Sequence, residues 1–421
     1  MIWPEGCAGP VAGVGRCSRG LGVAAEATAL LGAPVKADRV SVALWPLPGV
    51  AVDGLTVQAR TPLSLERVEL RPRWLPLLGG ELRVQTLVVR RAMLPESTVA
   101  LITRHLDDPA RRPANAPPED GAIDFGLLPR ELVLDEVTWL AGDGARTTFD
   151  AELRLDADGW PARADAAVTL GAHRGTQLRL VRDGAATAWD LQARLGGGTV
   201  QGPITITLPA TDARDRSVAL KGTLRTTGVE VSALTAPSKT LSGRLQADTT
   251  LAARFPPRAS ADDLIRALRT DTRFTVTDAV LHGVDLAKAV GTVGLSRGGE
   301  TALDTLSGQV ATRGRAIQLT DLQAKSGVLA ATGEVAVSPA RALSGRVRVD
   351  MTRGATGGVV GVPLAVGGTL DDPQVSLSRS ALLGAAIGTA VLPGVGTGAG
   401  ANIGDRIGEG LKGLFGGDGK P

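Results

Sequence analysis

The stretch RLQADTTLAARF (244–255) decides the fold class, because apolar and polar side chains alternate along most of its length. Leu245, Leu251 and Phe255 fall on one side of an extended chain, and the residues between them are mostly charged or polar. Successive side chains of a β-strand point to opposite faces of the sheet. The stretch is therefore predicted to form a long strand with one apolar face and one solvated face.

The same alternation recurs through most of residues 123–377, for example in ELRLD (152–156) and GRVRVDM (345–351). In the second of these, Val347 and Val349 alternate with charged residues. Strands with one apolar and one charged face are typical of antiparallel sheets that meet water on one side. The sequence therefore predicts a mainly β fold with a long antiparallel sheet and few short helices.

A loose glycine motif accompanies these strands. It occurs in ALKGTL (219–224), TLSGRL (240–245), TLSGQV (305–310) and ALSGRV (342–347). Each copy places a glycine where a new alternating run begins, which predicts a meander whose strands restart after a glycine kink. One helix, ADDLIRALRT (261–270) after the cap residue Ser260, is expected to interrupt the meander.

The chain is expected to divide into five segments. The first twenty residues are left unassigned, a helix is expected from Ser97 to Leu106, and the proline-rich stretch DDPARRPANAPPEDGA reads as a linker. The expected segments are an N-terminal segment 1–20, a region of strands and short helices 21–106, a linker 107–122, a β-sheet region 123–378 and a glycine-rich tail 379–421.

Composition excludes several classes of function. The 46 basic and 43 acidic residues are interleaved and give a net charge of only +3, with no basic stripe of the kind that neutralises phosphates. Aromatic residues make up 3% of the chain and tyrosine is absent, so a base-stacking surface is not expected. We therefore expect no nucleic-acid partner.

No motif in the chain carries recognisable catalysis. His105, His173 and His282 lie far apart and lack metal-ligand spacing, and Cys7 and Cys17 have no histidine near them. There is no nucleophile elbow and no phosphate-binding loop. The sequence therefore predicts a protein that is not an enzyme, with no metal site, no cofactor and no histidine-dependent activity.

The tail carries no charge between Arg379 and Asp405, and glycines recur four residues apart. This spacing keeps small residues on one helix face and permits close packing, whereas glycine alone weakens a helix by ~1 kcal/mol. We expect a glycine-zipper helical hairpin that contacts a membrane or a partner helix; packing on the protein's own sheet is the alternative. The candidate contact residues are Leu383, Ile387, Gly396, Gly400, Gly404 and Gly408.

Several segments resemble the AsmA family. GAPVKADRVSVALWPLPGVAVDGLTV (32–57) and LRPRWLPLLGGELRVQTLVV (70–89) are similar to its N-terminal region. HGVDLAKAV (282–290), residues 300–338 and VPLAVGGTLDDPQVSLS (362–378) resemble its C-terminal region in order and spacing. The family's N-terminal membrane helix is not found in this sequence.

The resemblance implies a non-enzymatic periplasmic protein associated with the inner membrane of Gram-negative bacteria. It further implies a long, curved β-sheet with an apolar groove, and a role in moving phospholipid towards the outer membrane. Phospholipid and membrane are then the expected partners. The candidate groove residues are Leu245, Leu251, Phe255, Val347 and Val349.

Other functions remain open at this point. The apolar strand faces could be covered by helices and the tail, which would make an ordinary β-core rather than a groove. The alternative function is a scaffold that assists outer-membrane protein assembly without lipid cargo. A hydrolase on a β-scaffold has the least support, because no sequence motif marks it.

Overall fold

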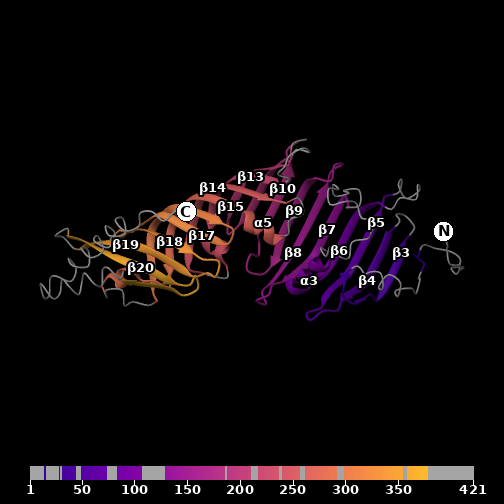
Figure 1. The fold of residues 1–421 in the computed structure, drawn as a ribbon, viewed down its shortest axis with the longest axis horizontal. Coiled ribbons are helices and arrows are strands. Elements are labelled where there is room, and N and C mark those ends of the chain that lie inside the picture. Colours follow the sequence, from indigo (N-terminus) through magenta and orange to yellow (C-terminus); the bar gives the residue numbers. More distant parts are fainter. Residues whose placement is uncertain are drawn as a thin grey trace, which may run out of the picture. The chain divides into compact units, whose positions relative to one another are not determined.

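The computed structural model is mainly β, as the alternating sequence predicts. It describes residues 14–15, 28, 31–43, 49–73, 83–106, 129–184, 187–209, 217–236, 239–256, 261–291, 298–327, 329–353 and 358–377. The chain divides into two compact units, Met1–Arg182 and Asp183–Pro421, each of which is described by itself below. The four helices among the described residues are short, and the strands run side by side within each unit (Figure 1).

Unit 1 contains ten strands and one helix among its described residues. The strands are β1 (Val14–Gly15), β2 (Val35–Lys36), β3 (Arg39–Ala43), β4 (Gly49–Val57), β5 (Leu63–Pro72), β6 (Val84–Pro95), β7 (Glu131–Leu140), β8 (Arg146–Leu155), β9 (Pro161–Leu170) and β10 (Gln177–Arg182). The helix α3 (Glu96–Leu106) begins where β6 ends and coincides with the helix expected from Ser97.

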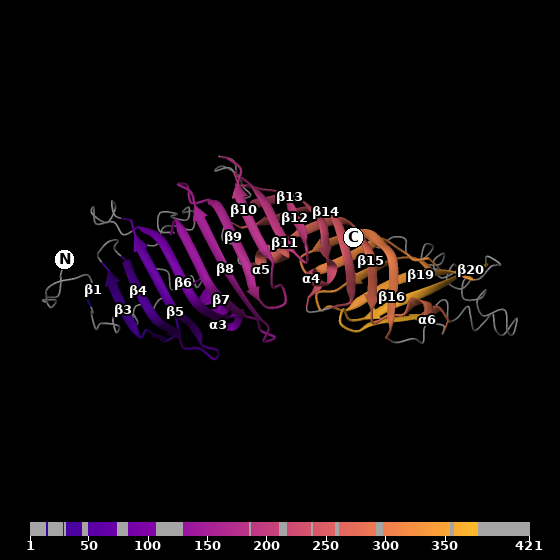
Figure 2. The same cartoon turned by 180° about the vertical axis from the view of Figure 1, so that it is seen from behind.

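The strands of unit 1 pair mostly in chain order. From β3 to β10 each strand pairs with the next, and every pair is antiparallel except β6–β7, which is parallel. A parallel pair requires a connection that returns along the sheet, and α3 is the described part of that connection. Figure 2 shows α3 near one end of these strands.

Unit 2 is an unbroken antiparallel meander. Its strands are β11 (Ala188–Leu195), β12 (Gly198–Thr207), β13 (Val218–Glu230), β14 (Leu241–Phe255), β15 (Arg269–His282), β16 (Glu300–Arg313), β17 (Ala316–Lys325), β18 (Leu329–Val337), β19 (Leu343–Arg353), β20 (Gly358–Gly368) and β21 (Pro373–Leu377). Each pairs with the next in sequence. Its helices are α4 (Val231–Thr235), α5 (Ala261–Ala267) and α6 (Leu286–Gly291).

The sheet of unit 2 curls until distant strands meet. The Thr240 hydroxyl, just before β14, donates a 2.6 Å hydrogen bond to the Leu370 carbonyl, in the turn after β20. Gly283 follows β15, and a Cβ at this position would contact the ring of Pro373 at the start of β21. One hydrophobic core consequently includes residues from every strand between β14 and β21, together with Val231 of α4 and Leu286 of α6.

Residues with positive φ interrupt the strand alternation. Asp278 in β15 has φ 50°, and the buried positions change from Phe274 and Val276 before it to Ala279 after it. Glu136 in β7 has φ 52°, and its N–H donates to the Asp150 carboxylate at 2.8 Å. Such irregularities bend a strand and increase its twist. Odd-numbered and even-numbered residues therefore exchange faces part of the way along these strands.

Three details differ from the sequence-based expectation. The helix expected at 261–270 ends at Ala267, because β15 begins at Arg269, and α4 and α6 also interrupt the meander. The motif glycines lie inside strands, and a Cβ at Gly345 would come within 2.3 Å of the Glu334 carbonyl oxygen. Close backbone approach is thus the reason for glycine there.

Candidate functional site

Two rows of aliphatic side chains cross seven strands of unit 1. Residues directly opposite each other in neighbouring strands share a face, and the strand registers connect these rows from β4 to β10. One row is Val50, Leu70, Leu87, Leu132, Leu153, Ala164 and Leu180. The other is Val52, Val68, Val89, Leu134, Ala151, Ala166 and Leu178.

These two rows, named here the unit 1 apolar face, remain accessible. None of the fourteen side chains is buried, and Val50 and Leu178 at the two margins are 37% and 39% exposed. Helix α3 covers the same sheet face further along the strands, where Val99 and Ile102 pack against the buried cluster that includes Val57 and Leu63. With strands about 4.8 Å apart, each row extends about 29 Å.

The groove residues expected in unit 2 lie on a closed surface instead. Leu245 and Val349 belong to one row across β13–β20. Val349 has 0% exposure, Leu251 only 9%, and Leu245 and Val347 pack against the same core. The curl of this sheet brings its own side chains together, so these positions form a protein core. For Leu251 and Val349 this corrects the expectation of an open groove, whereas Leu245, Val347 and Phe255 stay partly exposed.

The expected membrane-contact residues cannot be placed. Leu383, Ile387, Gly396, Gly400, Gly404 and Gly408 lie outside the described residues, as does the expected glycine-zipper hairpin. Within the described part of the chain, no helix has the length and hydropathy needed to cross a bilayer.

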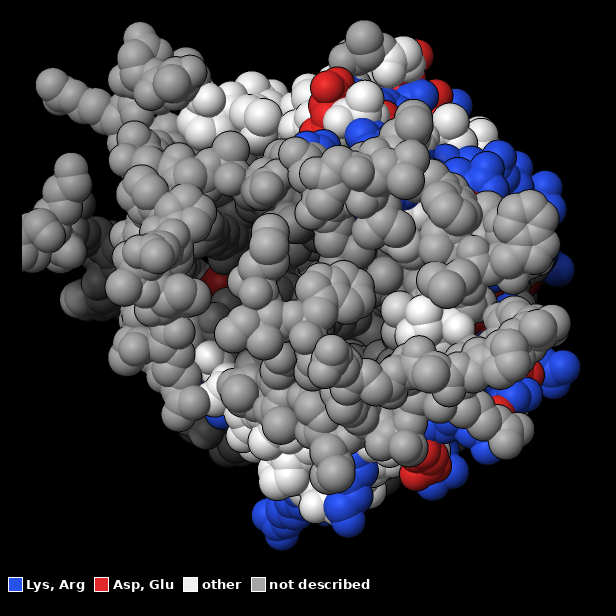
Figure 3. Space-filling view, turned by 90° about the vertical axis from the view of Figure 1, so that its right-hand side faces the viewer, with Lys and Arg blue, Asp and Glu red and all other residues white. Residues whose placement is uncertain are grey.

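The opposite face of unit 1 is charged. Glu69 of β5 accepts hydrogen bonds from Arg67 Nε at 2.8 Å and Arg71 Nη2 at 3.0 Å. Burial raises the pKa of Glu69, but these hydrogen bonds and the charges of Arg67 and Arg90 together outweigh it and hold the pKa below its ordinary value. Arg163 and Arg179 share Asp165 in the same way. Basic and acidic side chains also lie together at the margin of the molecule in Figure 3. The unit 1 sheet is therefore two-faced, with one face suited to water and one to hydrocarbon.

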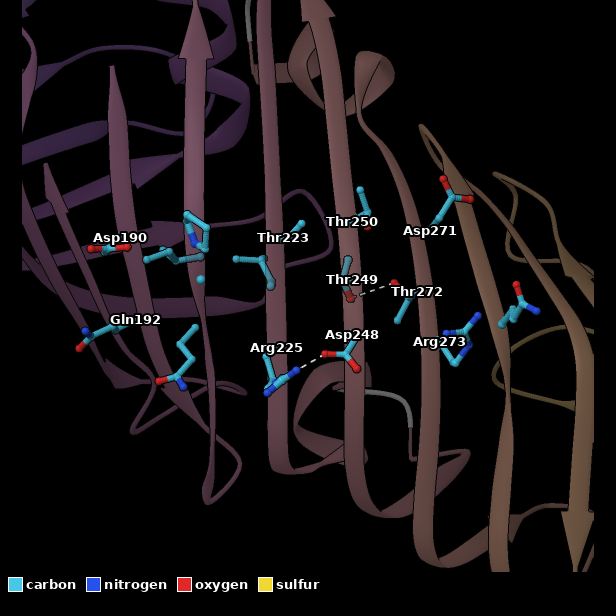
Figure 4. A pocket seen from close by; sticks show the side chains of 16 residues that line it. Asp190, Gln192, Thr223, Arg225, Asp248, Thr249, Thr250, Asp271, Thr272 and Arg273 are labelled. Carbon is cyan, nitrogen blue, oxygen red and sulfur yellow. Dashed lines mark hydrogen bonds and ion pairs between the residues drawn. The ribbon is translucent and has the colours of Figure 1, made fainter. Parts of the chain in front are cut away.

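The polar face of unit 2 forms a shallow trough across β11–β16 (Figure 4). Its cavity volume is about 720 Å³. One row of opposed residues crosses it, and Arg225 and Asp248 in this row form an ion pair at 3.1 Å. Both side chains are well exposed, so this pair contributes little to stability. The row consists of Gln192, Gln201, Arg225, Asp248, Arg273 and Gln309.

The structure gives His282 neighbours that the sequence did not indicate. Ser242 and Glu300 lie within hydrogen-bond distance of its two ring nitrogens. His105 and His173 lie in unit 1, far from His282 in sequence. No group of His, Cys, Asp and Glu suited to a metal ion occurs among the described residues.

Comparison of the chain with known protein families, with curated proteins and with solved structures finds no match.

Proposed function

We propose that this chain is an envelope protein that binds phospholipid by its acyl chains along the unit 1 apolar face and passes it between the inner and outer membranes. The observation that carries the proposal is the pair of aliphatic rows, in which every side chain keeps some exposed surface. Unit 2 contributes a closed core and is not assigned to the lipid.

The size of the face fits an acyl chain. Each methylene group removed from water contributes about 0.8 kcal/mol, so ten of them covered by the face would contribute on the order of 8 kcal/mol. A row of about 29 Å is longer than one extended acyl chain. A phospholipid that lies across the strands would therefore be held mainly by hydrophobic contact, with its head group left in water.

The resemblance to the AsmA family supports the choice of ligand and compartment. Its members are implicated in phospholipid movement across the periplasm. The segments 32–57 and 70–89 that carry the resemblance include strand β4, the end of β5 and the first half of β6, all of which belong to this face. A periplasmic, membrane-associated location follows as part of the same proposal.

A scaffold for outer-membrane protein assembly is the second candidate. Strand β20 pairs with β21 only from Leu364 to Gly368, so its part from Gly358 to Pro363 has no partner on that side among the described residues. An unpaired strand edge can accept a strand from another protein. A partner protein that adds a strand there would use backbone hydrogen bonds and no lipid.

Lipid analysis of the purified protein distinguishes the two functions. The chain is isolated without detergent from a bacterial envelope and its retained lipids are quantified by mass spectrometry. About one phospholipid per chain is the expected result. A lipid-free protein that copurifies with an outer-membrane assembly protein would contradict the proposal and favour the scaffold.

A further inference from the structure

Three side chains on the polar face of unit 2 form a connected chain of hydrogen bonds. Ser242 Oγ lies 2.9 Å from His282 Nε2, and His282 Nδ1 lies 2.8 Å from Glu300 Oε1. The residues come from the start of β14, the end of β15 and the start of β16. A hydroxyl, an imidazole and a carboxylate in this order are the parts of an activated serine nucleophile.

Strand geometry explains why the three residues meet. Ser242 is opposite Val280, so His282 is its diagonal neighbour on the same face, and His282 is directly opposite Glu300. The positive φ of Asp278 is essential to this arrangement. Without it, strict alternation would place His282 on the side of the buried Phe274. The irregularity thus moves a histidine from the apolar face to the polar face.

The backbone beside Ser242 is also held in place. Gly243 has φ 129°, and its N–H donates a 2.8 Å hydrogen bond to Glu230 Oε1. A Cβ at this position would approach Val276 Cγ1 to 2.7 Å. The neighbours of Ser242 and His282, Leu241 and Leu281, pack against the hydrophobic core. The serine therefore sits on a strand end with a fixed side-chain direction.

The hydrogen-bond roles follow from the chemistry of the groups. An ionised carboxylate only accepts hydrogen bonds, so His282 Nδ1 must donate to Glu300. In the neutral imidazole Nε2 then carries a lone pair and accepts the Ser242 hydroxyl proton. Such an arrangement directs the serine proton at a base, which is the state required for nucleophilic attack.

We propose that Ser242, His282 and Glu300 form an acyl-transfer site that hydrolyses carboxylic esters. Ser242 Oγ attacks the ester carbonyl carbon while its proton passes to His282 Nε2. The bond to the alcohol oxygen breaks, and His282 returns the proton to that leaving alcohol. Water then attacks the acyl-serine with the same proton relay and releases the carboxylic acid. Glu300 is a positioning residue that orients the imidazole.

The solvent exposure of these side chains determines the class of ester and the rate of hydrolysis that we expect. The His282 and Glu300 side chains are 34% and 66% exposed, so an ester reaches the site directly from water. A solvated carboxylate stabilises the imidazolium less than a buried one, because water screens the interaction. We therefore expect a slow reaction on small, activated esters, and covalent labelling is a sharper assay than turnover.

The test is labelling of the full chain with a fluorophosphonate probe. Ser242 Oγ attacks phosphorus, the phosphorus–fluorine bond breaks, fluoride leaves, and the proton passes to His282. Tandem mass spectrometry is expected to find the adduct on Ser242. Ser242→Ala should abolish it, and His282→Gln should slow it about 100-fold or more. The matched control is Ser376→Ala, an exposed β21 serine, which should leave labelling unchanged.

The positioning role of Glu300 is tested by comparing its removal with a substitution that keeps a carboxylate. Glu300→Ala should slow labelling by about ten-fold or more, and Glu300→Asp should restore part of the rate because it keeps a carboxylate for Nδ1. Hydrolysis of p-nitrophenyl acetate should follow the same order. An unlabelled Ser242 in the folded parent chain, or a labelling rate unaffected by His282→Gln, would overturn the proposal. Lipid binding by unit 1 involves other residues, so its outcome is independent.

Discussion

Val349→Asp is expected to lower the free energy of unfolding of unit 2 by about 4 kcal/mol or more, since it puts a carboxylate without a partner into a dry core. Val349 has 0% exposure and belongs to the core shared by strands β14 to β21. Folding must then either bury the charge or open the sheet around it. Urea unfolding followed by far-UV circular dichroism measures the change.

Ser344→Asp is the matched control for this core variant. Ser344 is an exposed residue of the same strand, β19, on its solvated face. The same new carboxylate there should change stability by no more than about 0.5 kcal/mol. Equal urea midpoints for the two variants would show that the unit 2 interior is not a closed core, and would restore the open groove expected from sequence.

The second large effect concerns lipid content. Ala166→Asp places a charge in the middle of the unit 1 apolar face, between Ala151 and Leu178. An acyl chain that covers this position must either desolvate the carboxylate or lose contact with the neighbouring strands. We expect at least about a ten-fold drop in retained phospholipid, equivalent to about 1.4 kcal/mol of binding free energy.

The neighbouring alanine provides the control. Ala167 follows on the same strand, points to the opposite face, and stands opposite Asp150. Ala167→Asp therefore places two like charges side by side and is the harder variant to fold. It should nevertheless retain lipid at the level of the parent chain. Parallel loss of lipid in both variants would mean that stability, not the apolar face, determines lipid content.

Much of the fold can be predicted from local pattern alone. The run 244–255 alternates along most of its length, and the structure contains the expected strand as part of the fifteen-residue β14. The helix from Ser97 was equally clear, because it follows a strand and precedes a proline-rich stretch. Alternation of apolar and polar residues indicates a strand and its two faces. Both can be predicted because they depend only on residues that are neighbours in sequence.

The location of the exposed apolar face could not be predicted in the same way, because it depends on contacts between residues that are distant in sequence. Val349 and Leu153 alternate with polar neighbours in similar ways, yet Val349 is fully buried and Leu153 is partly exposed. The difference arises from the curl of unit 2, which rests on contacts such as Thr240 with Leu370, 130 residues apart. Sequence therefore identified apolar faces correctly but placed the open one in the wrong unit.

The second difficulty in predicting the site was to assign odd-numbered and even-numbered residues of a strand to the correct face. Val50 and Val52 share a face with Leu55 and Val57, although two of these positions are even and two are odd. The change occurs at Gly54, which has φ 65°. The same kind of change at Asp278 brings His282 to Ser242. At Gly54 and at Asp278 the positive φ reverses the face of every later residue on the strand. Of these two residues, only the glycine could be suspected from its residue type.

Photocrosslinking to a phospholipid tests the central claim most directly. A phosphatidylcholine with a diazirine on its acyl chain is bound to the full chain, irradiated, and the adducts are located by tandem mass spectrometry. The account predicts adducts on strands β4–β10 at side chains of the two aliphatic rows, such as Leu134 and Leu153. Adducts confined to unit 2, or spread equally over the charged face around Glu69, would contradict it.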